Sequence, residues 1–208
     1  NIIYGKYSSK TDTGPTEQVD PVGSTPADLT DTTTAPDAGC AATQTGDIVS
    51  LARAELAKGA IEKPIGCDHA NSSAVGDCGA DVNKYTDKHL EYRCADFVSW
   101  IYKQAGKPFT GGSSGGWRYP GVSNLADWFK KNGVYTANGP SATPKPGDVY
   151  FIAGYEHAGI VDHVDGKTLY TISGNTSVDS TSNGRGVGDG VYMNFQSNSR
   201  IIGCGALK

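Results

Sequence analysis

The sequence contains no hydrophobic run long enough to cross a bilayer, few charged residues and no C-x-x-C pair. A membrane-spanning helix needs roughly 20 consecutive, mostly apolar residues, so we expect no span in this chain. Charged residues make up 19% of the composition, the net charge is −4, and the basic residues form no stripe. These features argue against nucleic acid as a partner, and the irregular cysteine spacing argues against a structural zinc site.

The N-terminal segment is poor in large apolar residues, whereas the rest of the chain alternates apolar runs with turn residues. From Thr11 to Asp37 the sequence is dominated by Thr, Pro and Asp, and such a stretch buries too little surface to offset its ordering entropy. We therefore predict a tail or linker at residues 1–45 and one folded domain at 46–208. The chain starts at Asn1 without a Met or an apolar signal core, as expected of a secreted chain whose signal peptide has been removed.

Five cysteines are present, an odd number that leaves at least one unpaired in an oxidising compartment. Cys67 and Cys78 bracket a short loop that a disulfide would close. A bridge between Cys40 and Cys204 would fasten the two ends of the domain, which leaves Cys94 free. The alternative is a cytosolic protein with five reduced cysteines.

Hydrophobic periodicity predicts helices in the first half of the domain and strands in the second. Apolar residues recur at helical spacing over 47–58, from Cys94 to Gly106, and from Ser123, a candidate N-cap, to Gly133. After Pro146-Gly147 the pattern becomes extended. Strands are expected at 149–152, 158–164, 168–173, 191–195 and 200–203. This order predicts an α+β fold with an antiparallel sheet.

Cys94 lies in E-Y-R-C-A-D-F-V-S-W, at the expected first turn of an amphipathic helix. Unpaired backbone N–H groups and the helix dipole would lower the pKa of a thiol there, which favours the nucleophilic thiolate. A buried cysteine that packs as a small hydrophobic residue is the structural alternative.

A cysteine nucleophile needs a base, and His157 is the best placed of the four histidines because it opens a predicted strand. His163 is six residues further along that strand and has no obvious partner in the sequence. Asn175 ends the next strand, where its side chain would accept a hydrogen bond from the imidazole as in Cys-His-Asn enzymes. A turn residue is the alternative for Asn175.

Four segments occur in an order that resembles the CHAP family, the cysteine, histidine-dependent amidohydrolase/peptidase domains. They are C-A-D-F-V-S-W-I-Y-K-Q-A-G, P-G-D-V-Y-F-I, H-A-G-I-V and T-I-S-G-N-T-S. The resemblance covers roughly residues 46–208, includes features of the bacterial secreted branch, and implies a papain-like α+β fold with N-terminal helices on a C-terminal antiparallel sheet. It also implies that Cys94 is the nucleophile, His157 the general base and Asn175 the third catalytic residue.

The resemblance implies an extracellular, cell-wall-associated hydrolase with bacterial peptidoglycan as its partner. Its expected reaction is amide cleavage at the N-acetylmuramoyl-L-alanine bond or within stem peptides and cross-bridges, through an acyl-enzyme on Cys94. Two alternatives remain: a catalytically weakened CHAP-fold module that binds the cell wall, and an amide hydrolase acting on a small soluble substrate.

Ser173 departs from the family pattern, which has glutamate in the corresponding E-G-N element. A serine accepts a hydrogen bond but adds no charge, so three outcomes are open: Asn175 suffices to orient the imidazole, an acidic residue from elsewhere takes over, or activity is weakened or lost.

Tyr92 is a candidate site residue whose hydroxyl would donate to the oxyanion; the alternative is a packing aromatic. No cofactor is required, although calcium is an option because oxygen-bearing side chains cluster before and after the nucleophile, namely Asp81, Asn83, Asp87, Glu91 and Asp96.

Overall fold

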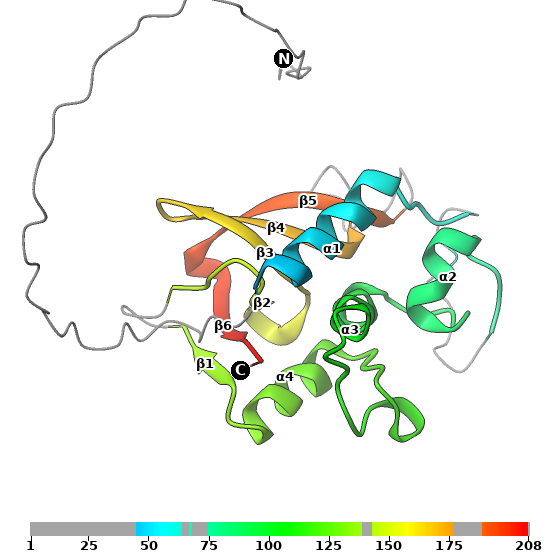
Figure 1. The fold of residues 1–208 in the computed structure, drawn as a ribbon, viewed down its shortest axis with the longest axis horizontal. Helices are drawn as coiled ribbons and strands as arrows, with labels where there is room; N and C mark the ends of the chain where they lie inside the picture. The colour runs from blue at the N-terminus through cyan, green and yellow to red at the C-terminus, as the bar shows by residue number, and fades with distance from the viewer. Residues whose placement is uncertain (1–44, 64–66, 68–74, 139–142, 177–188, 208) are drawn as a thin grey trace, which may run out of the picture. The chain divides into compact units, whose positions relative to one another are not determined.

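The computed structural model describes residues 45–63, 67, 75–138, 143–176 and 189–207 (Figure 1). Four helices come first in the chain and a six-stranded sheet follows. The fold is therefore α+β and papain-like, with helices packed on a C-terminal antiparallel sheet, as the sequence predicts. The predicted tail, residues 1–45, lies outside the described residues except for its last residue.

All pairings in the sheet are antiparallel, and the strand order is β1-β6-β2-β3-β4-β5. The strands β2, β3 and β4 are neighbours at its centre, so residues far apart in sequence lie side by side there. Each opposite pair follows from the register, for example Tyr150 with Gly159 and Ile160 with Ile172. The strands are β1 (Tyr135–Ala137), β2 (Val149–Ile152), β3 (Ala158–Asp165), β4 (Thr168–Thr176), β5 (Gly190–Ser197) and β6 (Ile201–Gly205).

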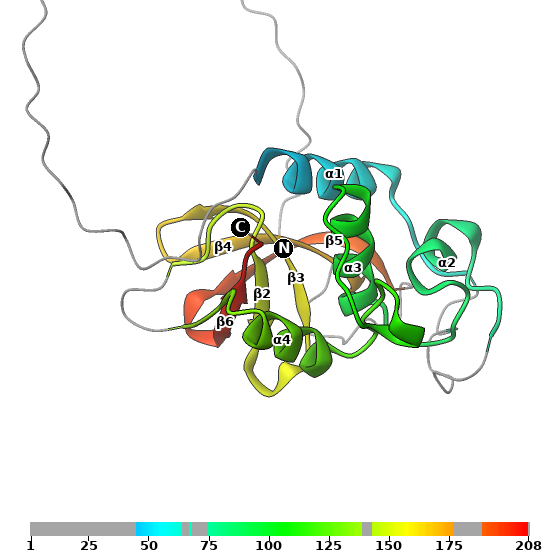
Figure 2. The same cartoon turned by 60° about the horizontal axis from the view of Figure 1, so that its bottom comes forward.

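The helices are α1 (Thr45–Lys58), α2 (Ala80–Thr86), α3 (Cys94–Gln104) and α4 (Val122–Lys131). Helix α3 packs against β3 and β4, α1 also contacts the sheet, and α2 contacts α3 on its other side (Figures 1 and 2). The buried face of α3 carries Phe97, Val98 and Ile101. Burial of such a side chain contributes about 1.5–3 kcal/mol, so packing against the sheet stabilises this helix far more than its intrinsic propensity does.

The two faces of the sheet have different neighbours. Val149 and Phe151 of β2 belong to the main core together with the helices, whereas Tyr150 and Ile152 belong to a smaller cluster. Alternate residues of a strand point to opposite faces. Tyr150 is therefore directed to the face that the helical core does not occupy.

The predicted elements agree with the structure except at three places. Helix α2 was not predicted, because its seven residues show little apolar periodicity, and neither was the three-residue strand β1. The prediction that Ser123 is an N-cap is wrong. Helix α4 begins at Val122, and Gly121 occupies the cap position without a side-chain hydrogen bond.

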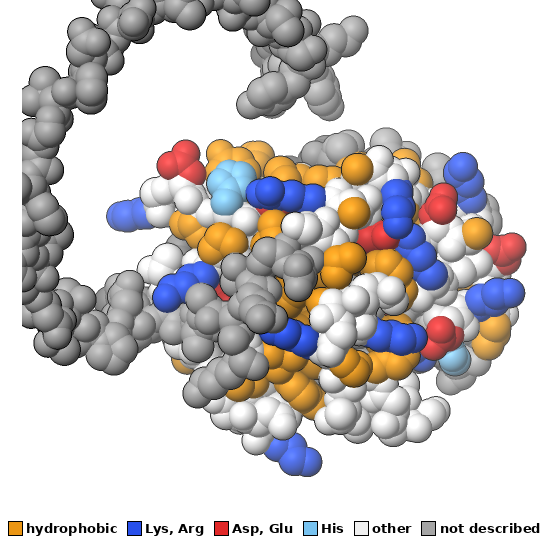
Figure 3. Space-filling model, viewed as in Figure 1, with side chains coloured by type: hydrophobic (Ala, Val, Ile, Leu, Met, Phe, Trp, Pro, Cys, Tyr) orange, Lys and Arg blue, Asp and Glu red, His pale blue; other side chains and the backbone are white. Residues whose placement is uncertain are grey.

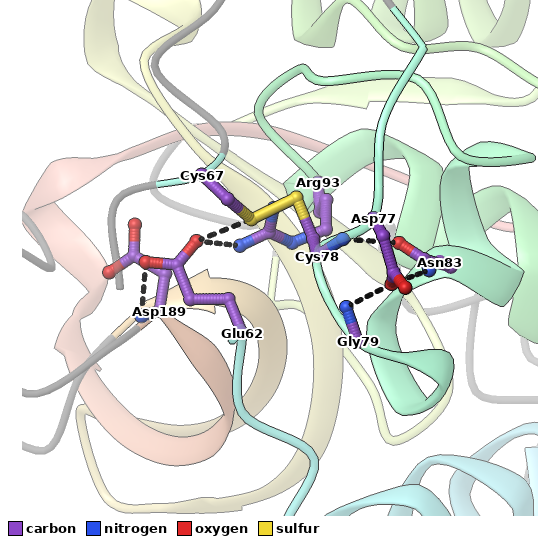
Figure 4. The surroundings of a disulfide bond; sticks show 8 residues. All are labelled: Glu62, Cys67, Asp77, Cys78, Gly79, Asn83, Arg93 and Asp189. Atoms are coloured by element: carbon purple, nitrogen blue, oxygen red, sulfur yellow. Dashed lines mark hydrogen bonds and ion pairs between the residues drawn. A yellow bond between two sulfur atoms is a disulfide. The ribbon is translucent and has the colours of Figure 1, made fainter. Parts of the chain in front are cut away.

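The Cys67–Cys78 disulfide is present and Cys94 is free, as predicted. Cys204 is also disulfide-bonded, and Cys40, its predicted partner, lies outside the described residues. Figure 4 shows the surroundings of the Cys67–Cys78 bridge. The Cys78 backbone N–H donates to Asn83 Oδ1 at 2.9 Å, and Asn83 Nδ2 donates to Asp77 Oδ1 at 2.7 Å. These bonds attach the bridge to helix α2.

No helix within the described residues has the length and apolar character of a membrane span. On the face shown in Figure 3, basic, acidic and hydrophobic side chains are interspersed. That face therefore lacks the continuous basic surface that nucleic-acid binding requires.

Asp148, at the turn into β2, provides a prediction about pH. Its side chain is buried, and burial raises its pKa from 3.8 to about 7. Between about pH 4 and pH 7 the folded chain therefore keeps a proton that the unfolded chain has released, so this residue makes stability fall as pH rises. The expected slope approaches about 1 kcal/mol per pH unit.

Asp148→Asn should remove that contribution and still accept the hydrogen bond from Lys145 N–H. The measurement is chemical denaturation of both proteins from pH 4 to pH 8, with stability expressed as the difference between them. The difference is needed because His157, whose pKa is lowered, has the opposite slope between about pH 4 and pH 6.5. A difference independent of pH would contradict the raised pKa of Asp148.

Candidate active site

Cys94 is the first residue of helix α3 and lies against the central strands. Two observations fix this position. A Cβ on Gly174 of β4 would lie 2.8 Å from Phe97 Cβ and 3.2 Å from the Arg93 carbonyl oxygen, so a glycine is needed for the first turn of α3 to approach β4 this closely. The backbone N–H of Ala158, at the start of β3, interacts with the sulfur of Cys94 and lowers its pKa.

The prediction that the thiol pKa is lowered is wrong for this structure. Burial raises the pKa of Cys94 to about 11, against the smaller opposing effects of the backbone N–H groups of Ala158, Ala95 and Cys94 itself. The nearby carboxylate of Asp96 also raises it. Desolvation of the thiolate outweighs the helix N-terminus because the side chain is only 4% exposed. At neutral pH the thiol is therefore protonated.

His157 immediately precedes Ala158 and follows the short helix η3 (Ala153–Tyr155), which joins β2 to β3. The residue is half-buried. Burial lowers the pKa of its imidazole to about 4, and the positive charge of Arg200 adds to this effect. The imidazole is neutral at pH 7, the form that accepts a proton.

The position of Ala158 brings the backbone at His157 to the start of helix α3, so the structure places the two residues in one region. No direct hydrogen bond joins the thiol and the imidazole in the described part of the chain. The resting site therefore contains a neutral thiol and a neutral imidazole. Catalytic hydrogen bonds are often longer in a free enzyme than in its substrate complex.

Asn175 and Ser173 lie at the end of β4, beside the first turn of α3. Asn175 has a left-handed backbone with φ 55°, and its buried Oδ1 has no hydrogen-bond partner among the described residues. The predicted hydrogen bond from His157 to Asn175 is thus not formed in this structure. Ser173 is fully buried, and its hydroxyl is likewise unpartnered. Tyr92 is 56% exposed, so it is not a packing aromatic.

Tyr150 is a residue of the site that the sequence did not single out. It is fully buried, its ring centroid is 6.3 Å from that of His157, and its hydroxyl has no hydrogen-bond partner within the described part of the chain. Burial raises its pKa to about 12, and the charge of a Cys94 thiolate contributes to the rise. A tyrosine between valine and phenylalanine in P-G-D-V-Y-F-I reads as an ordinary strand residue, so no sequence signal distinguishes it.

Arg200 is a second such residue. It ends the short helix η4 (Asn198–Arg200), its side chain is exposed, and its charge lowers the pKa values of both His157 and Tyr150. The arginine therefore adds a positive charge near the site from a segment more than 40 residues away in sequence.

His163 does not compete for the role of base. Its Nδ1 is 2.8 Å from Asp162 Oδ2, and its ring stacks on Tyr170 at a centroid distance of 4.2 Å. Asp162 is in turn held by Arg53 through two hydrogen bonds. The sequence did not reveal these partners, which give His163 a structural role. His69 lies outside the described residues.

The predicted calcium ligands do not converge on a cation site. The guanidinium of Arg118 forms a short ion pair with Glu91 and lies 3.3 Å from Asp96 Oδ1, and all three side chains are buried. Asn83 is engaged by Asp77 and Cys78. Among the described residues, no three His, Cys, Asp or Glu side chains are grouped so that they could hold a metal. The single charge of Arg118 is thus already shared by these two carboxylates.

Comparison with known proteins finds one domain family and two solved structures that resemble parts of this chain. Residues 83–175 match the model of the CHAP domain. None of the curated proteins matches the chain. Two solved structures are similar to it: the crystal structure of Ly7917 (15% identity, TM-score 0.42, covering 78% of this chain and 62% of that one), and Ly7917 with the hydrolyzing product of MDP (16%, 0.40, 77% and 62%). The chain thus spans less than two thirds of their length. The segment at residues 83–175, which contains Cys94 and His157, therefore matches the CHAP domain.

Proposed function

We propose that this protein is a secreted peptidoglycan hydrolase that cleaves amide bonds, with Cys94 as nucleophile, His157 as general base and Asn175 as a supporting residue. The observation that carries the proposal is the free thiol at the first residue of α3, next to the backbone N–H of Ala158, which directly follows a neutral histidine. The Cys67–Cys78 disulfide supports an extracellular location, because such bridges persist in oxidising compartments.

The resting protonation states define the first chemical step. With a thiol pKa of about 11 and an imidazole pKa of about 4, a stable thiolate–imidazolium pair does not form before substrate binds. The imidazole of His157 takes the thiol proton as the sulfur attacks the amide carbonyl. This is general-base catalysis, a contribution worth roughly a hundred- to ten-thousandfold in rate.

The later steps use the same residues in reverse roles. The oxyanion of the tetrahedral intermediate lies near the start of α3, where the Cys94 backbone N–H is the first candidate donor. The imidazolium of His157 then protonates the leaving amine, and a thioester on Cys94 remains. Water, activated by the neutral imidazole, hydrolyses the thioester and restores the thiol.

Mass spectrometry of digested cell wall tests this function. Purified peptidoglycan is incubated with the protein, and the soluble products are compared with those from heat-denatured protein. New fragments that end in a free carboxyl and a free amino group at one amide position are expected. Their masses distinguish cleavage at the sugar–peptide junction from cleavage within the peptides.

Two results contradict the proposal. Binding to the wall without any new fragments would favour a wall-binding module, for which the Ser173 substitution is the motivating feature. Hydrolysis of small soluble amides without release of wall fragments would favour an amide hydrolase that acts on a small soluble substrate.

A further inference from the structure

Two buried hydroxyls, one of them on a ring near His157, have no assigned role in the reaction. Tyr150 and Ser173 are both fully buried, and neither hydroxyl has a hydrogen-bond partner among the described residues. A buried polar group without a partner costs about 1–3 kcal/mol. Such groups are rare in folded proteins and often mark a functional site.

Gly159 brings the two hydroxyl-bearing residues together. It lies opposite Tyr150 in the sheet, on the strand between β2 and β4. A Cβ at Gly159 would lie 2.6 Å from Ser173 Cβ and 2.8 Å from Tyr150 Cε1. The absence of a side chain at Gly159 thus allows Tyr150 and Ser173 to meet over the middle strand, on the same face of the sheet.

The imidazole of His157 lies beside Tyr150 of this pair and has no carboxylate partner among the described residues. Its ring is 6.3 Å from the ring of Tyr150, centroid to centroid. The charged group that acts on it is Arg200, which is positive. Asp96, the acidic residue that acts on Cys94, is itself engaged by Arg118. Besides Asn175 Oδ1, the neutral hydroxyls of Tyr150 and Ser173 are therefore acceptors available for the imidazole's second N–H.

We propose that Tyr150 and Ser173 are positioning residues that orient His157 through their hydroxyls, in place of a carboxylate. This inference rests on the proposed function of His157 as general base. When one ring nitrogen accepts the thiol proton, the other ring N–H donates to a hydroxyl of the pair, directly or through one water. The hydroxyls keep their own protons, so one proton moves from Cys94 to His157 and later to the leaving amine.

The protonation of Tyr150 agrees with this role. Burial raises its pKa to about 12, against the smaller opposing effect of the nearby Thr171 and Ser173 hydroxyls, neither of which meets it in hydrogen-bond geometry. It therefore remains a neutral phenol at physiological pH. A neutral acceptor stabilises an imidazolium less than a carboxylate does, so His157 stays a weak base that takes its proton only during the attack.

Tyr150→Phe is the test, and Tyr102→Phe is its matched control. Tyr102 is also fully buried, but its hydroxyl donates to the Gly147 carbonyl at 3.0 Å, away from His157. On soluble peptidoglycan fragments, Tyr150→Phe should lower kcat about ten- to a hundredfold with KM unchanged. Its melting temperature should not fall, because the lost hydroxyl had no partner. Tyr102→Phe should show the reverse pattern, with normal kcat and a lower melting temperature.

A second readout needs no substrate. The rate of Cys94 alkylation by iodoacetamide is measured from pH 6 to pH 10 in the parent protein, Tyr150→Phe, Ser173→Ala and His157→Ala. A base that removes the thiol proton makes the parent react faster than His157→Ala near neutral pH. Tyr150→Phe and Ser173→Ala should both shift the profile toward that of His157→Ala.

These readouts separate the two proposals. Alkylation and kcat profiles of Tyr150→Phe and Ser173→Ala that coincide with those of the parent would overturn the positioning role. If the variants show the expected alkylation shifts but the parent releases no wall fragments, the positioning role stands and the peptidoglycan substrate is rejected. Ser173→Ala serves as the second variant if Tyr150→Phe does not fold.

Discussion

Replacing Cys94 with alanine is expected to reduce peptidoglycan hydrolysis by at least about a thousandfold while the protein stays folded. Without the sulfur no acyl-enzyme forms, and losses of this size or larger accompany removal of a catalytic nucleophile. The side chain is small and makes no disulfide, so the free energy of unfolding should change by about 1 kcal/mol. Fragment release measured by mass spectrometry, together with a denaturation curve, gives both quantities.

The matched control changes the two cysteines of the Cys67–Cys78 bridge. A Cys67→Ser, Cys78→Ser double variant loses a bridge that closes a loop with a sequence separation of 11 residues, which contributes about 3 kcal/mol in the chain-entropy description. It should therefore be less stable than the parent yet retain hydrolysis below its melting temperature. If Cys94→Ala remains active, the nucleophile lies elsewhere and the proposed mechanism is wrong.

Arg118→Ala is expected to lower the free energy of unfolding by about 3–5 kcal/mol, because it leaves two buried carboxylates without a cation. Glu91 and Asp96 then face each other in a region that excludes water. Burial and the charge of Glu91 already raise the pKa of Asp96 in the parent, despite Arg118. The penalty should therefore be smaller at pH 4 than at pH 7, since protonation of Asp96 removes one of the two repelling charges.

Lys130→Ala is the control for a surface charge. Its ion pair with Asp127 is largely exposed, and such pairs contribute about 1 kcal/mol or less. Urea denaturation of the three proteins at both pH values measures the comparison. Equal, small losses in the two variants would show that Arg118 does not neutralise the carboxylates as the geometry indicates.

Much of the fold follows from local patterns in the sequence. The strand at 149–152 is predicted with its correct bounds, because four apolar residues follow the turn at Pro146-Gly147. Helix α3 is predicted because its apolar residues form one stripe. Helix α2 and strand β1 are short, so their own residues carry little signal. Helix α2 is bound to Cys78 through Asn83, and β1 is held by its pairing with β6.

The sequence supplies candidate residues for the site but not the electrostatics of that site. Motif order identifies Cys94 and His157 as candidates, whereas the thiol pKa depends on burial, which a motif does not report. Tyr150 enters the site only because Gly159 lies opposite it, and a register between strands is not visible in a single strand. Arg200 acts across a long separation in sequence, which periodicity does not capture.

The ion pair beside the disulfide has a consequence for how the protein assembles. Arg93, the residue before Cys94, donates to Glu62 at 2.8 Å, and the other oxygen of Glu62 accepts from the Asp189 backbone at 3.3 Å (Figure 4). These contacts span 31 and 127 residues of sequence. Because closing long loops is slow, Glu62, which binds the residue before the thiol, gains its bond from the Asp189 backbone only after most of the chain has been synthesised and has docked.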